Sequence, residues 1–160
     1  MNIFHDPDAA GYVIDAGLEF YMCSGTHVTD HVLFRWQELE KWFSGDSLQD
    51  RAVLTMLKYY YDACSGFGEN IDLKLSIHDA ATVMFLLEPD CYRTVKCHCA
   101  IELTGTETYG YSLIDIYNID GWEESEFNIH YVYILDEKTD YLRHLILRGI
   151  KGFDLFPEEG

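Results

Sequence analysis

The sequence predicts an α+β fold, with two N-terminal helices packed on a mostly antiparallel sheet of five or six strands. Apolar residues recur at helical spacing in two segments before residue 65, and the segments after residue 70 alternate with period two or are rich in β-branched and aromatic residues. Strands grouped in succession favour α+β over a doubly wound α/β fold. With 160 residues, three prolines and no linker-like stretch, we expect one domain, residues 1–160.

The first third of the chain is expected to hold short strands and then two helices. Residues 12–23 favour β-structure and are interrupted at Gly17. Thr26 is a candidate N-cap for a helix to about residue 43, and one face of that helix would carry Val28, Val32, Trp36, Leu39 and Phe43. Ser47 resembles the start of a capping box for the second helix. The apolar stripe of the second helix is Val53, Leu54, Leu57, Tyr60, Tyr61 and Cys64, with Gly66 as its stop.

The remaining segments are expected to form the sheet. Residues 71–78 alternate between apolar and polar side chains, and residues 81–87 are apolar on both faces, which is typical of a central strand. Further strands are predicted over residues 91–103, 109–119 and 127–135. Residues 141–147 fit either a last strand or a short helix, and we favour the strand.

The chain lacks the sequence features of secretion and of a membrane span. Acids stand near its start where a secretory leader carries positive charge, and its apolar runs are far shorter than the roughly 20 residues that cross a bilayer. Five cysteines form an odd count, which does not suit a disulfide framework. We therefore expect reduced thiols and a cytoplasmic protein, in a bacterial or phage-infected cell.

The charge is strongly negative and unevenly distributed. The formal net charge is −17, and there is no Lys or Arg in residues 1–34 or between Lys96 and Lys138. Such a surface excludes direct binding of nucleic acid or of an anionic membrane. Because large self-repulsion costs stability, the pattern indicates a negative field directed at a basic protein partner.

Candidate metal ligands are more typical of core and surface positions. Cys97 and Cys99 share one face of an expected strand with apolar residues. The sequence has no second closely spaced pair of ligands that could complete a zinc site with them and Cys91. His27 and His31 are four residues apart but lack the acid of the His-Glu-x-x-His pattern. We expect neither a metal nor a cofactor.

His78 and Asp79 form a candidate catalytic pair at a strand end. On a strand, adjacent side chains point to opposite faces, so Asp79 would not orient the His78 ring, and a polar turn is the preferred interpretation. The chain has no nucleophile elbow and no phosphate-binding glycine loop. The sequence therefore predicts no catalytic residues and no enzyme.

The strongest candidate binding surface combines an aromatic ring with acids, an apolar anchor with an anionic rim. Its residues are Trp122, Glu123, Glu124, Glu126, Asp120, Glu107, Asp136 and Glu137. Arginines of a partner can stack on the ring and pair with the carboxylates.

These features lead to the hypothesis of a non-enzymatic inhibitor of a basic nuclease or nucleic-acid-binding effector. Such proteins include toxin immunity proteins and phage anti-defence or anti-CRISPR DNA mimics. Two alternatives stay open: a small cytosolic enzyme with a site around His78, Asp79 or His130, and an acidic chaperone or adaptor. Homodimerisation also remains possible.

Overall fold

The computed structural model describes residues 2–45, 47–65 and 73–152. These residues belong to two compact units, one formed by residues 1–24 and 92–133 and the other by residues 25–91 and 134–160. Helices and strands occur together in each unit, which confirms the α+β class. The single domain over residues 1–160 stays a prediction.

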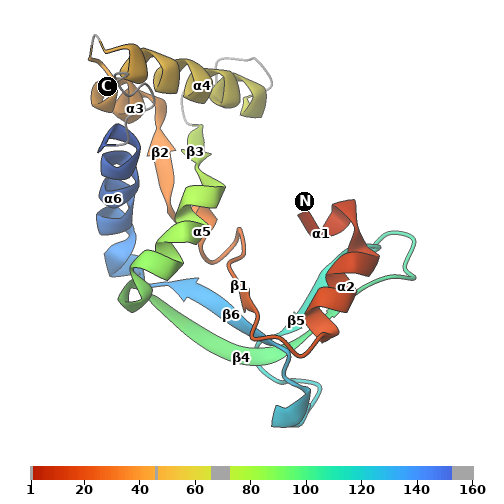
Figure 1. The fold of residues 1–160 in the computed structure, drawn as a ribbon. Helices are drawn as coiled ribbons and strands as arrows, with labels where there is room; N and C mark the ends of the chain where they lie inside the picture. Colours follow the sequence, from red (N-terminus) through yellow and green to blue (C-terminus); the bar gives the residue numbers. More distant parts are fainter. Residues whose placement is uncertain (1, 46, 66–72, 153–160) are drawn as a thin grey trace, which may run out of the picture. The chain divides into compact units, whose positions relative to one another are not determined.

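The first unit contains two short helices and a sheet. Its elements are α1 (Asn2–His5), α2 (Pro7–Asp15), β1 (Tyr21–Met22), β4 (Tyr92–Ile101), β5 (Ser112–Asp115), the 3-10 turn η3 (Glu124–Glu126) and β6 (Ile129–Ile134), the last residue of which falls in the second unit. The strand order is β1-β6-β4-β5 (Figure 1). β1 pairs with β6 in parallel and β4 with β5 antiparallel, so the sheet is mixed and has four strands, not the expected five or six.

Helix α2 replaces the start of the predicted strand region at residues 12–23. The Asp6 side chain accepts a hydrogen bond from the Ala9 N–H at 3.0 Å, and Pro7 occupies the first helical turn, where its missing N–H costs nothing. These two start signals outweigh the β-propensity of Tyr12, Val13 and Ile14. The strand prediction is correct only at β1.

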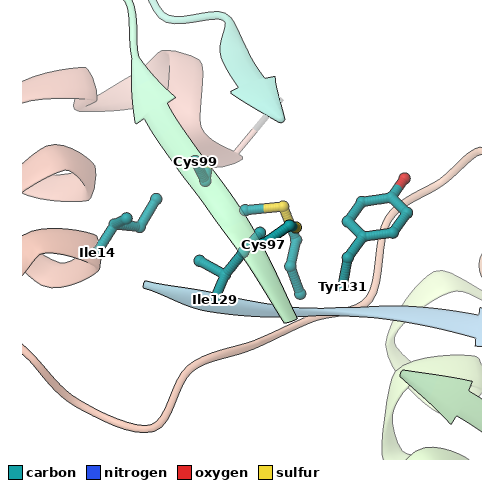
Figure 2. Packing of buried hydrophobic residues seen from close by; sticks show 6 residues of the cluster. Ile14, Cys97, Cys99, Ile129 and Tyr131 are labelled. Carbon is teal, nitrogen blue, oxygen red and sulfur yellow. The ribbon is translucent and has the colours of Figure 1, made fainter. Parts of the chain in front are cut away.

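One face of the sheet in the first unit packs against α2. Cys97, Cys99 and Ile129 are almost fully buried, together with Ile14 of α2 and Tyr131 (Figure 2). The alternation expected for residues 91–103 is confirmed by β4, which places both sulfur atoms in the core. Segments 109–119 and 127–135 form strands as predicted, but β5 and β6 are shorter.

The second unit is mostly helical. Its elements are η1 (Thr29–His31), β2 (Leu33–Arg35), α3 (Trp36–Trp42), α4 (Leu48–Cys64), β3 (Lys74–Ser76), α5 (His78–Leu87), η2 (Pro89–Cys91), η4 (Asp136–Lys138) and α6 (Thr139–Gly152). β2 and β3 form a separate two-stranded antiparallel sheet.

The helix predicted from Thr26 to about residue 43 is wrong in its first half. Residues 29–35 form η1 and β2, and only Trp36–Trp42 is helical. Val28, Val32 and Leu39 are nonetheless fully buried. The helical spacing therefore identified core residues correctly. The backbone conformation was decided by the pairing of β2 with β3, which local spacing cannot indicate.

Helix α4 is confirmed, including its start. The Asp50 N–H donates to the Ser47 hydroxyl at 3.0 Å, which is the predicted N-cap. The helix ends at Cys64, and the predicted stop at Gly66 lies outside the described residues.

The predicted strands at residues 81–87 and 141–147 are both wrong, because these segments lie in helices α5 and α6. For α6 the helical alternative is correct: Leu142, Ile146 and Leu147 follow helical spacing and are buried. For α5 the two apolar faces are real, but they belong to a helix. Among the described residues, no helix is both long and apolar enough to span a membrane.

Candidate functional site

The candidate site lies where β3 ends and α5 begins, within the second unit. β3 ends at Ser76, and His78 and Asp79 form the first turn of α5 (Figure 1). Both side chains are exposed. The expectation that the two side chains point to opposite faces of a strand is therefore wrong. His78 and Asp79 instead follow one another around the N-terminus of a helix.

Two buried hydroxyl groups hold the imidazole of His78. Thr29 Oγ1 lies 2.7 Å from His78 Nδ1, and Ser76 Oγ lies 3.2 Å from the same atom. Thr29 is 3% exposed and Ser76 is 8% exposed. Ser76 donates its own proton to the Thr29 carbonyl oxygen at 2.9 Å, so its hydroxyl oxygen can only accept from His78 Nδ1–H.

This anchoring defines what the ring can do. Nδ1 is occupied by the two hydroxyl groups, and for Nε2 the described part of the chain supplies no partner. An imidazole held at one nitrogen and open at the other can transfer a proton to or from a bound molecule at neutral pH. Buried polar side chains that fix the ring of an exposed histidine are typical of a functional site.

Asp79 adds a carboxylate beside this ring. An acid in the first turn of a helix is stabilised by the helix dipole. On α4, burial is the largest cause that raises the pKa of Tyr60, followed by the Cys64 thiol and the Asp79 carboxylate. The N-terminus of α5 and the C-terminal half of α4 therefore form one electrostatic neighbourhood.

Metal ligands do not gather in the described residues: no group of three or more His, Cys, Asp or Glu side chains could hold an ion there. Cys91, Cys97 and Cys99 are buried free thiols. Burial raises the pKa of Cys99 to about 12 and that of Cys23 to about 11, which disfavours the thiolate that metals bind. His31 lies in the second unit near Asp136, with its Nδ1 3.6 Å from a carboxylate oxygen.

The structure divides the expected acidic binding surface between the two units. Trp122, Glu123, Glu124, Glu126, Asp120 and Glu107 belong to the first unit, whereas Asp136 and Glu137 belong to the second. The seven acids are exposed. The Trp122 ring is partly buried and stacks on His98 at 3.9 Å between ring centroids, so it is not the freely exposed anchor that the sequence indicated.

His130, the third histidine of the enzyme alternative, lies away from His78 in the chain and in the other unit. It stacks on Tyr21 at 4.7 Å and lines a hollow of about 790 Å³. Lys96, His98 and Glu126 line the same hollow. The anchored imidazole at His78 is the arrangement that supports a specific reaction.

Comparison with known proteins identifies a family. Residues 1–139 match the family model described as inosine-uridine preferring nucleoside hydrolase. The pyrimidine-specific ribonucleoside hydrolase RihA of Photobacterium profundum is 30% identical over 123 residues, covering 74% of this chain and 38% of that protein. RihA of an Enterobacter species is 28% identical over 123 residues, covering 76% of this chain and 38% of its own length.

Solved structures agree at the level of the fold. The chain matches a purine-preferring ribonucleoside hydrolase from Gardnerella vaginalis with a TM-score of 0.73, at 18% identity, over 93% of this chain and 46% of that one. A plant nucleoside hydrolase matches with a TM-score of 0.76, also at 18% identity and the same coverage. The chain thus spans less than half the length of these proteins.

These matches overturn the inhibitor hypothesis. An enzyme family replaces the non-enzymatic inhibitor, the immunity protein and the anti-CRISPR DNA mimic, and the basic nuclease or effector partner is unsupported. The error has a physical origin. Net charge bears on solubility and on the rate of association, and an acidic surface is compatible with many activities.

The sequence did contain the site signal. The sequence favours a polar turn at His78 and Asp79, because adjacent side chains on a strand point to opposite faces, whereas in the structure both residues open helix α5. Thr29 was missed, because it lies 49 residues from His78 in the chain and nothing local marks a threonine as its partner. A Ser-x-His-Asp sequence before an apolar segment was the available signal.

Proposed function

Because the chain belongs to the inosine-uridine preferring nucleoside hydrolase family, we propose that it supplies part of the active site of a nucleoside hydrolase. Such an enzyme uses water to break the bond between a nucleobase and ribose. The observation that carries the proposal is the His78 imidazole, anchored at Nδ1 by Thr29 and Ser76 and open at Nε2, within the family match.

The substrate class is taken from the relatives with the higher identity. The pyrimidine-specific hydrolases are 27–30% identical, against 18% for the purine-preferring structure. We therefore propose a pyrimidine ribonucleoside, with uridine as the first compound to test. Reduced cysteines fit action in the cytoplasm, which stays a prediction.

His78 acts as the general acid in this proposal. Cleavage of a glycosidic bond passes through an oxocarbenium-like transition state, in which the leaving group gains negative charge. Protonation of the departing base by a positioned histidine lowers that barrier, with a typical effect of about 10²–10⁴ in rate. Because Nδ1–H donates to the anchoring hydroxyl groups, Nε2 carries a transferable proton when the ring is protonated at both nitrogens, as an imidazolium.

Asp79 is the nearest carboxylate in sequence to this acid. A carboxylate on the reacting face stabilises a cationic sugar or orients the attacking water. Both roles need further groups around the sugar, and the chain spans 38% of its pyrimidine-specific relative. We therefore assign proton transfer to this chain, and the complete reaction to a protein that contains the whole hydrolase fold.

The test measures ribose release from uridine by two proteins: the chain alone, and a chimera in which it replaces the matched share of the Photobacterium profundum enzyme. In the chimera, we expect His78→Gln to lower kcat by about 10²–10⁴ with little change in KM, because it removes the acid and not substrate binding. His144→Gln is the matched control, since His144 is an exposed histidine of the same unit on α6.

Variants of the anchor separate positioning from folding. Thr29→Val removes the hydroxyl group that contacts Nδ1, and Thr29→Ser keeps it. A lower kcat in the first and recovery in the second supports the anchored acid. Equal activity of His78→Gln and the parent chimera, or a folded chimera that hydrolyses no nucleoside, contradicts the proposal.

A further inference from the structure

A groove on the second unit brings aromatic and cationic side chains together. Helices α3 and α4 pack against one another in this unit (Figure 1), and a groove of about 580 Å³ opens along α4. Its lining includes Trp36 of α3 and Arg51, Lys58, Tyr59 and Asp62 of α4. Sites for small molecules have volumes of about 300–1,000 Å³ and combine apolar surface with a few polar groups. The groove therefore has the size and composition of a small-molecule site.

This groove is separate from the candidate site at His78. The residues of α4 that line it recur every three or four positions, so they share one face of the helix. Val53, which is buried, lies on the opposite face of the same helix. Neither His78 nor Asp79 is among the described residues that line the groove. A molecule bound here is therefore a second ligand, in addition to the substrate.

Arg51 places a positive charge at one end of the groove. Its side chain is exposed, and within the described part of the chain no carboxylate forms an ion pair with its guanidinium. A guanidinium donates five N–H groups in a planar fork that matches the oxygen atoms of a phosphate. This end of the groove therefore favours an anion with several oxygen atoms.

Two aromatic rings lie farther along the groove. The Tyr59 side chain is 71% exposed, and the Trp36 ring is partly buried, with its centroid 5.4 Å from that of Tyr61. Exposed aromatic rings are the surfaces on which proteins stack nucleobases, and this stacking tolerates any base because every base has a flat face. The middle of the groove therefore favours a planar ring.

An ion pair provides both donors and an acceptor near these rings. Lys58 Nζ lies 2.5 Å from Asp62 Oδ1 and 5.8 Å from the centroid of the Trp36 ring. The edge of a nucleobase carries donors and acceptors side by side, and ammonium and carboxylate groups are among its usual partners. Seven residues of helix, or about 10 Å, separate Lys58 from Arg51, which one nucleotide can span from phosphate to base.

We propose that this groove binds a nucleoside monophosphate. The phosphate binds Arg51, and the base stacks on Tyr59 and Trp36. The Lys58–Asp62 ion pair binds the edge of the base. The net charge of −17 does not prevent this, because exposed charges farther apart than about 8 Å are largely screened at physiological salt. The inference goes beyond the proposed function: the groove takes the phosphorylated form of the compounds that nucleoside hydrolases cleave.

The experiment measures binding of uridine 5′-monophosphate and adenosine 5′-monophosphate to the chain by equilibrium dialysis, at about 0.15 M salt. We expect at least one of them to bind 1:1 with a Kd below about 1 mM. Inorganic phosphate and the corresponding nucleoside each carry only part of the ligand. They should displace the bound nucleotide only at concentrations at least about tenfold higher than its own.

Variants locate the bound nucleotide. Arg51→Gln should weaken binding at least about tenfold, because it removes a charged hydrogen-bond donor. The matched control is Arg148→Gln, which removes the same charge from an exposed arginine of the second unit on α6 and should leave the Kd unchanged. Tyr59→Leu should weaken binding about fivefold or more, and Tyr59→Phe, which keeps the ring, should retain it. His78→Gln should have no effect.

Four outcomes overturn the inference. They are the absence of binding by both nucleotides, equal affinities in Arg51→Gln and Arg148→Gln, loss of binding in His78→Gln, and displacement by inorganic phosphate at the concentration of the nucleotide itself. The third outcome would place the nucleotide at the candidate site, and the fourth would show a site for simple anions. Ribose release from uridine is measured separately, so its absence counts against the proposed function alone.

Discussion

The two units treat their chemically reactive side chains in opposite ways. In the first unit, Cys97 and Cys99 point into the core against Ile129, where burial removes them from solvent (Figure 2). In the second unit, Thr29 and Ser76 are two of the three buried polar residues among those described, and they hold a histidine that is itself exposed.

This difference teaches how to distinguish structural from functional residues. A cysteine is a common core residue, and its burial needs no function. A buried hydroxyl group costs free energy unless it is hydrogen-bonded, so a pair of them directed at one exposed imidazole indicates a site in which geometry matters. The type of a reactive residue alone therefore does not distinguish a structural role from a functional one.

The largest expected difference between the two units is in the rate at which their thiols are labelled. We expect Cys64, which is exposed, to react with a maleimide at pH 8 orders of magnitude faster than Cys99, because burial raises the pKa of Cys99 to about 12. Mass spectrometry of labelled peptides measures both rates. Comparable rates would show that the core of the first unit opens readily.

The same pKa shift has a consequence for stability. The folded state prefers the neutral thiol of Cys99, so this contribution to stability is complete below the ordinary pKa of 9.0 and is lost as the pH rises through about 12. Alkaline conditions should therefore weaken the first unit.

A pair of apolar truncations compares the closed core of the first unit with an exposed position of the second. Ile129→Ala should lower the free energy of unfolding by about 2–5 kcal/mol, because it leaves a cavity in a fully buried position. Val83→Ala, at an exposed position of α5, should change it by no more than about 0.5 kcal/mol. Urea denaturation measures both, and a large loss for Val83→Ala would mean that the Val83 side chain is packed in the folded chain.

The helix caps are expected to have the smallest effects, and they test each unit separately. Asp6→Ala removes the bond to the Ala9 N–H, and Ser47→Ala removes the bond to the Asp50 N–H. Each should cost about 1 kcal/mol, while Asp6→Asn and Ser47→Thr should retain most of it. If thermal unfolding shows two transitions and each variant moves only one of them, the prediction of a single domain is wrong.

Sequence patterns were sufficient wherever a local signal decided the structure. The Ser47 cap and the following apolar stripe predicted α4, and the alternation along β4 predicted which thiols are buried. The same reasoning missed α2, although the Asp6-Pro7 start signal was present. It also assigned residues 81–87 to a strand, because a segment with two apolar faces is consistent with a central strand and with a helix that has a covered inner face and an open outer face.

The sequence by itself determined the α+β class, the strong helix α4, the buried positions of β4 and the adjacency of His78 and Asp79. Only the tertiary structure decided that His78 begins a helix and that Thr29 and Ser76 hold its ring. The physical reason is range. Caps and periodicity act over a few residues, whereas the contact between Thr29 and His78 joins positions 49 residues apart and exists only after η1, β3 and α5 have packed together.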